Sequence, residues 1–300
     1  MKLDQKVRNR WLIKVIFSSH INKCKFVEDI QVFKGIIGSG GYGEIYYALD
    51  LKMNNESVAV KVEPAIRKGK VAKRMILEQK LLLRLQGQPH APLMWGSGTE
   101  HGLNYIVMQL LSTNVADLKK QCPVHRLSRP TAGRIMQQVI SGLRGIHKVG
   151  YIHRDVKPAN MCFGLTEKSY RRLIIVDYGL ARRFRLANGK PIERRVRAGF
   201  RGTLRYVSIR VHDRQEQGPS DDLVALFFTL IEIVQGELPW RYEKSDRKMK
   251  IAKMELVGRV KRRLITSECT KPDQKLNLAH NRPLNDPYDW ENDYLEVMQE

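Results

Sequence analysis

The residues whose types and spacing could do chemistry lie in two short motifs, which we call acidic motifs because each contains one aspartate. They are the run His-Arg-Asp-Val-Lys-Pro-Ala-Asn at 153–160 and the run Asp-Tyr-Gly at 177–179. Transfer of a phosphoryl group to a hydroxyl needs a carboxylate beside that hydroxyl and further oxygen ligands on metal ions. Asp155 can take the first role, and Asn160 and Asp177 can take the second. A single Asp or Asn is usually a turn residue or a helix cap, but so many matched positions rarely arise by chance.

The composition suits a globular chain that folds as one large domain or as two compact lobes. Its 300 residues are 42% hydrophobic, so the chain can bury a substantial core. The formal net charge of +22 favours anionic partners, namely nucleic acid, acidic or phosphorylated protein, or anionic lipid. The sequence contains no RNA-binding aromatic motif, zinc-finger spacing or basic leucine zipper, so we expect no nucleic-acid partner.

The cysteines and the N-terminal residues bear on the cellular compartment. The four cysteines form no C-x-x-C pair, which argues against a zinc site and a disulfide framework and suits the cytoplasm or the nucleus. Residues 1–30 carry no chemical motif and are interpreted as an N-terminal extension. Their apolar stretch at 11–17 is short and is interrupted by Lys14, so we expect no secretory signal and no transmembrane segment. Packing on the following domain is the favoured role of this stretch, and peripheral membrane contact is the alternative.

The elements that must position the acidic motifs can be predicted from hydrophobic periodicity. Strands are predicted at 31–37, 44–48, 57–63 and 105–108, a glycine-rich turn at 38–43 and a second turn at 54–55. Helices are predicted at 71–86, 131–148 and 221–235. A dinucleotide-binding fingerprint would place a helix directly after the glycines, whereas here a strand follows. The glycines can let backbone amides close over phosphate oxygens instead.

The motifs taken together resemble those of the eukaryotic protein kinases. The resemblance rests on the glycine-rich run, on Val-Ala-Val-Lys at 58–61, on Glu78 and on the two acidic motifs. Instead of the usual Ala-Pro-Glu, the chain has Gly-Thr-Leu-Arg-Tyr-Val-Ser-Ile at 202–209, which is similar to the casein kinase 1 superfamily. Within that superfamily, three further runs resemble the tau-tubulin kinase branch, at 198–203, 238–241 and 286–291.

The resemblance implies an α+β chain with the two-lobed protein kinase fold, a β-rich N-lobe and a mainly helical C-lobe. It covers a kinase domain at 31–291, with the N-lobe at 31–108, the C-lobe at 109–291 and a C-terminal tail at 292–300. A shortened C-lobe is expected, because the chain between Trp240 and Trp290 is shorter than the family pattern and 260–275 is rich in Lys and Arg. Either the lobe is trimmed or the sequence is an incomplete gene product. The chain also has Arg210 and Tyr178 where the family has Asn and Phe.

The resemblance further implies ATP and Mg²⁺ as cofactors and assigns the nucleotide to named residues. Lys61 would hold the α- and β-phosphates and would itself be fixed by Glu78. The other residues that the resemblance assigns to the nucleotide are Ile37, Gly38, Gly40, Gly43, Ile45, Ala59, Met108, Leu110 and Asp177. Of these, Leu110 would lie in the hinge between the lobes, where the adenine ring could bond to main-chain groups.

The same resemblance assigns the catalytic roles. Asp155 would accept or orient the proton of the substrate hydroxyl, and Lys157 would lie near the γ-phosphate. Asn160 and Asp177 would bind Mg²⁺. Asp222 resembles the helix carboxylate that braces the catalytic loop in this family, which is a structural role.

The segment after Asp177 bears on control and on substrate choice. It contains no Ser or Thr as far as Arg201, so activity should not need a phosphate in this segment. The segment is strongly basic, with Arg182, Arg183, Arg185, Lys190, Arg194, Arg195, Arg197 and Arg201. A run of charges is usually a solvated face, but one beside a phosphate-transfer site could bind an acidic or phosphorylated substrate. Arg195 matches the family's phosphate-anchoring position.

The implied function is that of an active, monomeric serine/threonine protein kinase. Its expected substrates are acidic or pre-phosphorylated proteins, including acidic tails such as those of tubulin. Two other classes stay open. One is a pseudokinase or scaffold with a shortened C-lobe that binds acidic partners, and the other is a nucleic-acid or membrane-surface binder driven by charge. The complete catalytic set argues against both, while the shortened C-lobe favours the scaffold.

Overall fold

The computed structural model describes residues 30–40, 43–50, 53–67, 69–100, 102–122 and 124–265, without the side chains of 30–34, 40 and 257–265. The expectations for the N-terminal extension before residue 30, for the run at 286–291 and for the tail at 292–300 lie outside these residues. The chain divides into two compact units, which are described separately. The first unit ends at Leu111 and excludes Gln88–Ala91, which belongs to the second unit with Ser112 and all later residues.

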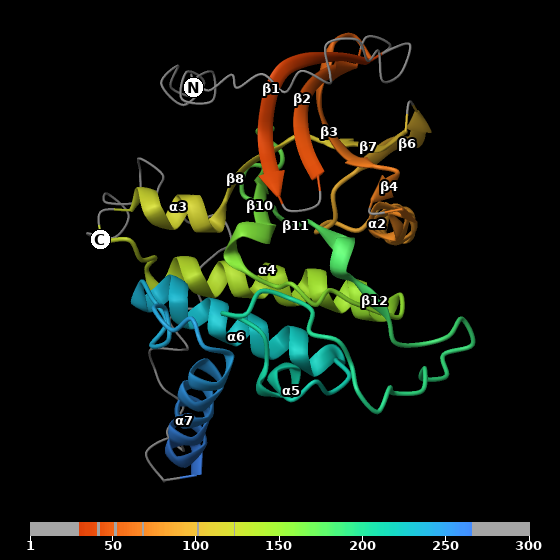
Figure 1. Cartoon of the computed structure of the whole chain (residues 1–300). Coiled ribbons are helices and arrows are strands. Elements are labelled where there is room, and N and C mark those ends of the chain that lie inside the picture. Colours follow the sequence, from red (N-terminus) through yellow and green to blue (C-terminus); the bar gives the residue numbers. More distant parts are fainter. Residues whose placement is uncertain are drawn as a thin grey trace. The chain divides into compact units, whose positions relative to one another are not determined.

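The first unit is built on an antiparallel sheet. Among the described residues its strand order is β1-β2-β3-β7-β6 (Figure 1). The strands are β1 (Ile30–Gly40), β2 (Gly43–Asp50), β3 (Glu56–Pro64), β6 (Met94–Glu100) and β7 (Leu103–Gln109). A short hairpin of β4 (Ile66–Arg67) and β5 (Lys70–Val71) leads into helix α2 (Lys73–Leu85). The glycine-rich turn predicted at 38–43 is wrong in extent, because Gly38 pairs with Ile45 and Gly40 pairs with Gly43 as strand residues.

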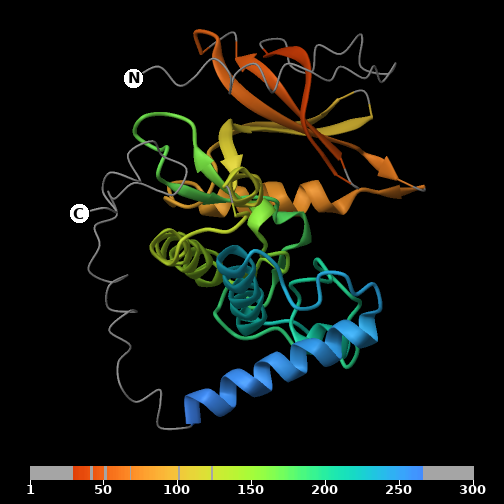
Figure 2. The same cartoon turned by 90° about the vertical axis from the view of Figure 1, so that its left-hand side faces the viewer.

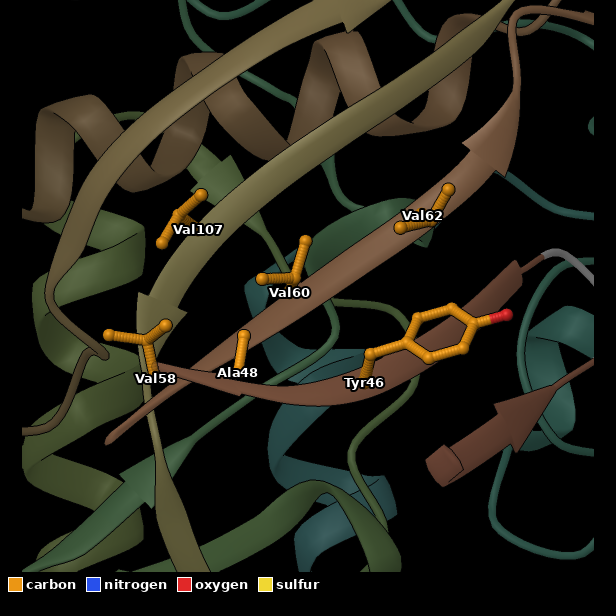
Figure 3. Packing of buried hydrophobic residues seen from close by; sticks show 6 residues of the cluster. All are labelled: Tyr46, Ala48, Val58, Val60, Val62 and Val107. Atoms are coloured by element: carbon orange, nitrogen blue, oxygen red, sulfur yellow. The ribbon is translucent and has the colours of Figure 1, made fainter. Parts of the chain in front are cut away.

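One face of this sheet carries a compact apolar cluster. Its buried members come from β2, β3 and β7 and are Tyr46, Ala48, Val58, Val60, Val62 and Val107 (Figure 3). Alternate residues of a strand point to opposite faces, so these positions leave Ala59 and Lys61 of β3 on the other face. Each fully buried valine side chain contributes about 1.5–3 kcal/mol of burial free energy. The cluster therefore holds the strands in the register that presents Lys61.

The second unit is mainly helical. Its helices are α3 (Val115–Gln121), α4 (Arg129–Lys148), α5 (Ile209–His212), α6 (Pro219–Gln235) and α7 (Asp246–Ile265). Helices α4 and α6 pack side by side (Figure 1). The helices predicted at 131–148 and 221–235 are confirmed, and each begins two residues earlier than predicted because its cap, Ser128 or Gly218, precedes the apolar pattern. No described helix combines the length and the hydropathy needed to cross a membrane.

Short strands frame the acidic motifs of the second unit. The strands β8 (Leu111–Asn114), β10 (Met161–Gly164) and β11 (Leu173–Ile175) form one small sheet, and β9 (Tyr151–Ile152) pairs with β12 (Arg182–Arg183). The 3₁₀ turns η1 (Pro158–Asn160) and η2 (Tyr178–Leu180) complete the motifs. The run at 153–160 thus lies between β9 and β10, and the run at 177–179 lies shortly after β11. The α+β class, with a β-rich first unit and a helical second unit, is confirmed.

Helix α7 is absent from the sequence-based predictions, and it packs beside α5 (Figure 2). Its Lys253 is fully buried, and Nζ lies 2.8 Å from the Leu204 carbonyl oxygen, 2.7 Å from that of Val207 and 3.0 Å from His212 Nε2. These acceptors match the donors of an ammonium group. Burial lowers the pKa of Lys253 to about 7. Because α7 is rich in Lys and Arg, its hydropathy pattern does not indicate that Lys253 faces inward.

Candidate active site

Asp155 is a buried carboxylate held from several sides. Its Oδ1 accepts hydrogen bonds from the Thr203 amide at 2.9 Å and from Thr203 Oγ1 at 2.7 Å. Its Oδ2 accepts from Lys157 Nζ at 2.7 Å and from Asn160 Nδ2 at 3.3 Å. Asn160 Nδ2 also donates to the Asp155 main-chain carbonyl oxygen at 2.9 Å. The structure therefore brings together Asp155, Lys157 and Asn160 of the predicted site, with a rigidly oriented carboxylate at the centre.

The loop that carries Asp155 is braced by helix α6. Asp222 of this helix is 2% exposed, and its Oδ1 accepts from the Arg154 amide at 2.8 Å. Its Oδ2 accepts from the His153 amide at 2.9 Å and from His147 Nε2 at 2.8 Å. Arg154 has φ of 68°, a left-handed conformation that costs a non-glycine residue about 1–2 kcal/mol. The bonds to Asp222 hold this conformation, as the resemblance implied for a bracing carboxylate.

Hydrogen bonds that involve main-chain groups and the His153 ring connect the two acidic motifs. His153 Nδ1 accepts from the Asp155 amide at 3.2 Å, which leaves Nε2–H to donate to the Val176 carbonyl at 3.1 Å. The Val176 amide in turn donates to the Asn160 carbonyl at 3.0 Å. These bonds, with the β10–β11 pairing, place Asn160 and Asp177 at one end of the same hairpin.

Asn160 and Asp177 suit a Mg²⁺ ion that is shared with a phosphate ligand. Mg²⁺ prefers oxygen ligands, and it is usually held by one or two carboxylates together with substrate phosphates and water. The part of the chain that the structure describes contains no group of three or more His, Cys, Asp or Glu side chains that could hold a metal ion. Asn160 and Asp177 offer an amide oxygen and a carboxylate, which are oxygen donors of the kind that Mg²⁺ takes when phosphates complete its ligands.

In the first unit, Lys61 of β3 forms an ion pair with Glu78 of α2. Lys61 Nζ lies 3.0 Å from Glu78 Oε1 and 2.7 Å from Oε2. The Glu78 side chain is only 4% exposed and that of Lys61 is 18% exposed. This is the pair that the resemblance implied, and it fixes the ammonium group on one face of the sheet.

The other residues predicted to contact the nucleotide lie on the same sheet or directly after it. Ile45 pairs with Lys61, and Ala59 pairs with Met108, so these side chains share one face because directly opposite residues point the same way. A Cβ on Gly43 would lie 2.3 Å from the Val62 carbonyl oxygen, so only glycine fits there. The remaining predicted residues are Ile37, Gly38 and Gly40 on β1 and Leu110 after β7.

Thr203 also belongs to the site, although its position in the sequence predicts no role for it. Besides its two bonds to Asp155, its Oγ1 accepts from Lys157 Nζ at 3.1 Å. The preceding Gly202 has φ of 109°, and a Cβ there would lie 2.6 Å from the Arg154 carbonyl oxygen. The run at 202–209 is a visible family signal, but the contact of its Thr with the catalytic loop depends on folding.

Thr203→Val is expected to lower kcat by about 10- to 100-fold, the equivalent of one lost hydrogen bond to a charged group. Valine keeps the shape of threonine but removes the hydroxyl that links Asp155 to Lys157. Thr203→Ser keeps the hydroxyl and should retain most of the activity. Initial rates of phosphate transfer by the two variants provide the measurement. Equal rates for the valine and serine variants would show that the hydroxyl does not position Asp155.

Arg195 lies in the basic segment that follows Asp177, and its guanidinium binds Glu216. Arg195 Nε lies 2.5 Å from Glu216 Oε2, and Nη2 lies 3.0 Å from Oε1. The hydrogen bond with Arg195 is the main cause that holds the pKa of Glu216 below its ordinary value. An incoming phosphate would therefore meet an arginine that already has an internal partner, which no sequence pattern reveals.

Comparison with known proteins agrees with this geometry. Residues 32–286 match the protein kinase domain family. The chain is 50% identical over 209 residues to a Caenorhabditis elegans protein named as a casein kinase I, across 70% of this chain and 61% of that protein. It is 35% identical over 252 residues to a Dictyostelium discoideum protein named as a serine/threonine-protein kinase, across 83% of this chain and 48% of that protein.

Residues 32–286, which match the protein kinase domain family, contain both acidic motifs, the Lys61–Glu78 pair and Thr203. The chain spans less than two thirds of the length of either relative. Protein kinase domains use ATP as the phosphoryl donor. The chain belongs to the protein kinase domain family, and it is similar to casein kinase I.

Proposed function

We propose that this chain is a serine/threonine protein kinase of the casein kinase 1 superfamily, on its tau-tubulin kinase-like branch. It transfers the γ-phosphate of ATP to Ser or Thr of acidic or pre-phosphorylated protein substrates. The observation that carries the proposal is the buried Asp155 carboxylate, which Thr203, Lys157 and Asn160 hold in one orientation. A buried carboxylate of the fold can also pair with a lysine, so what favours a catalytic role is that Lys157 and Asn160 have the spacing from Asp155 that the protein kinase catalytic loop has.

The residues of the site divide the work of phosphoryl transfer. Mg²⁺ with ATP supplies charge neutralisation on the phosphates, and Asn160 and Asp177 are the residues that would hold it. Asp155 Oδ2 accepts the proton of the substrate hydroxyl, while Thr203 keeps the carboxylate from rotating. Lys157, which already contacts this carboxylate, stabilises charge that develops on the transferred group.

Lys61 contributes to positioning in the first unit. It would hold the α- and β-phosphates of ATP, while Glu78 keeps its ammonium group in place. Ile45, Ala59 and Met108 present an apolar surface on the same face of the sheet, which suits the adenine ring.

We also propose that activity needs no phosphate in the activation segment, which is the basic segment from Asp177 to Arg201. No Ser or Thr occurs from Asp177 to Arg201. The remaining hydroxyl of this segment, on Tyr178, is buried and donates to the Ile175 carbonyl at 2.8 Å, so it is not presented to another kinase.

The test is transfer of radiolabelled phosphate from ATP by the full chain, after phosphatase treatment, to a panel of acidic, neutral and basic Ser/Thr peptides. Transfer to the acidic peptides is expected, and phosphatase treatment should not lower the rate. A folded chain that binds ATP and transfers no phosphate would instead support the scaffold interpretation. A large loss on dephosphorylation would contradict the proposed independence from phosphorylation.

The basic segment should select substrates by charge. Arg195→Gln is expected to raise KM about tenfold for a pre-phosphorylated peptide and much less for its unphosphorylated form, since a charge-assisted bond to phosphate is lost. Any effect of breaking the Glu216 contact would change both peptides alike, so the ratio of their KM values isolates the phosphate contact. Arg194→Gln is the matched control. Equal KM changes for both peptides would exclude Arg195 as an anion contact.

The general preference for acidic peptides should weaken with salt, because exposed charges are screened over about 8 Å at physiological ionic strength.

A further inference from the structure

Arginines crowd around the residue that precedes the catalytic Asp155. Arg154 donates through Nε to the Leu180 carbonyl at 2.6 Å and through Nη2 to the Ala181 carbonyl at 3.4 Å. Burial, followed by the charges of Arg182 and Arg201, lowers the pKa of Arg154 to about 10. Like charges on neighbouring side chains repel one another, and an anion placed among them lowers this repulsion.

Glu216 is the anion that the fold places among these arginines. It lies in the loop between α5 and α6, and its side chain is 8% exposed. Oε1 lies 3.1 Å from Arg182 Nε in an ion pair, while both carboxylate oxygens accept hydrogen bonds from Arg195. One carboxylate thus ties β12, at the start of the basic segment, to Arg195, further along the same segment.

The backbone around Glu216 is attached to the same segment. The Ala198 amide donates to the Arg214 carbonyl at 2.7 Å, and Gln217 Nε2 donates to the Arg201 carbonyl at 3.0 Å. Arg210 Nη2 donates to the Glu216 carbonyl at 3.3 Å. These bonds flank the Glu216 carboxylate on both sides, so its position depends on the fold and not on a flexible side chain alone.

Glu216 is connected to the reacting groups through both ends of the basic segment. Arg182 lies on β12, which pairs with β9, and β9 leads directly into the run that contains Asp155. The far end of the segment leads through Arg201 into Thr203, which bonds Asp155. The carboxylate is therefore connected to Asp155 through both ends of the segment.

In many kinases with an arginine before the catalytic Asp, a phosphorylated residue of the activation segment neutralises the arginines and orders the segment. We propose that Glu216 supplies that negative charge here as a permanent part of the fold, and that it is a positioning residue for Asp155. This inference rests on the proposed kinase function. A phosphate would bring a charge of about −1.5 to −2, more than a carboxylate, so the segment keeps a net positive charge for acidic substrates.

The test compares Glu216→Ala, Glu216→Gln and Glu216→Asp in the full chain. The Ala and Gln variants are expected to lose about 10- to 100-fold in kcat/KM for an unphosphorylated acidic peptide, and the Asp variant should lose less because it keeps the charge. Adding sodium sulfate should restore activity to Glu216→Ala severalfold, whereas sodium chloride at equal ionic strength should not. Glu193→Ala, which removes an exposed carboxylate from the same segment, is the matched control and should behave as wild type.

Limited trypsin digestion supplies a readout that does not depend on activity. Cleavage between Arg182 and Arg197 should be faster in Glu216→Ala than in wild type, and sulfate should slow it again. The inference is overturned if Glu216→Ala retains wild-type kcat/KM, or if its loss is rescued neither by sulfate nor by the Asp variant. If the wild-type chain transfers no phosphate, the proposed function fails, and the sulfate dependence of trypsin cleavage still decides whether the Glu216 charge orders the segment.

Discussion

Asp155→Asn is expected to lower kcat by about 10²- to 10⁴-fold, the range for a lost acid–base group, while nucleotide binding stays largely unchanged. The asparagine oxygen can still accept from Thr203, so the loop should keep its shape. Its amide cannot take a proton, and it would direct N–H groups at Lys157 Nζ and Asn160 Nδ2, which are donors themselves. Initial rates over a range of peptide and ATP concentrations give kcat, and titration with a fluorescent ATP analogue gives nucleotide affinity.

Asp213→Asn is a suitable control for this experiment. Asp213 carries a surface ion pair with Lys250, and the substitution makes the same chemical change away from the candidate site. It should leave both the rate and the melting temperature close to wild type, since exposed pairs contribute little. Wild-type turnover by Asp155→Asn would exclude Asp155 as the proton acceptor. A loss of nucleotide binding equal to the loss of turnover would show that the residue acts on structure instead.

Lys61→Met is expected to lower kcat/KM by about 10²- to 10³-fold, the usual effect of removing one electrostatic contact to the transition state. Methionine keeps the length and apolar stem of lysine but loses the ammonium group that faces Glu78. Since Glu78 is buried, losing the cation opposite it should also lower the free energy of unfolding, by about 1.5–3 kcal/mol. Phosphate transfer and chemical denaturation measure the two effects separately.

The double variant Lys61→Met/Glu78→Leu separates catalysis from stability. Replacing both members of a buried ion pair by apolar residues is often neutral for stability, so the double variant should unfold close to wild type. Its phosphate transfer should remain as low as that of Lys61→Met, because no cation is left to hold the phosphates. Recovery of transfer together with stability would contradict the proposed role of Lys61.

Much of the fold could be predicted because its signals are local. The valine-rich pattern around β3 and the periodic leucines of α2 predict those elements within one to two residues of their observed bounds. The glycine-rich run was harder, since Gly38 and Gly43 are weak strand formers that are held in register by pairing with neighbouring strands. Helix α7 escaped prediction because its buried Lys253 interrupts the apolar pattern that would indicate a packed face.

The sequence by itself determined the chemistry that is available. Asp155, Lys157 and Asn160 lie within one loop, so a carboxylate, a lysine and an amide are near neighbours along the chain, and the bonds from Asp222 then give this loop its shape. Only the tertiary structure decided which distant groups complete the site. Thr203 contacts Asp155 across 48 positions, and Glu216 contacts Arg195 across 21. Such contacts have no period along the chain. The first depends on where the end of the basic segment meets the catalytic loop, and the second on where the loop before α6 meets that segment, so both follow from how the elements of the second unit pack together.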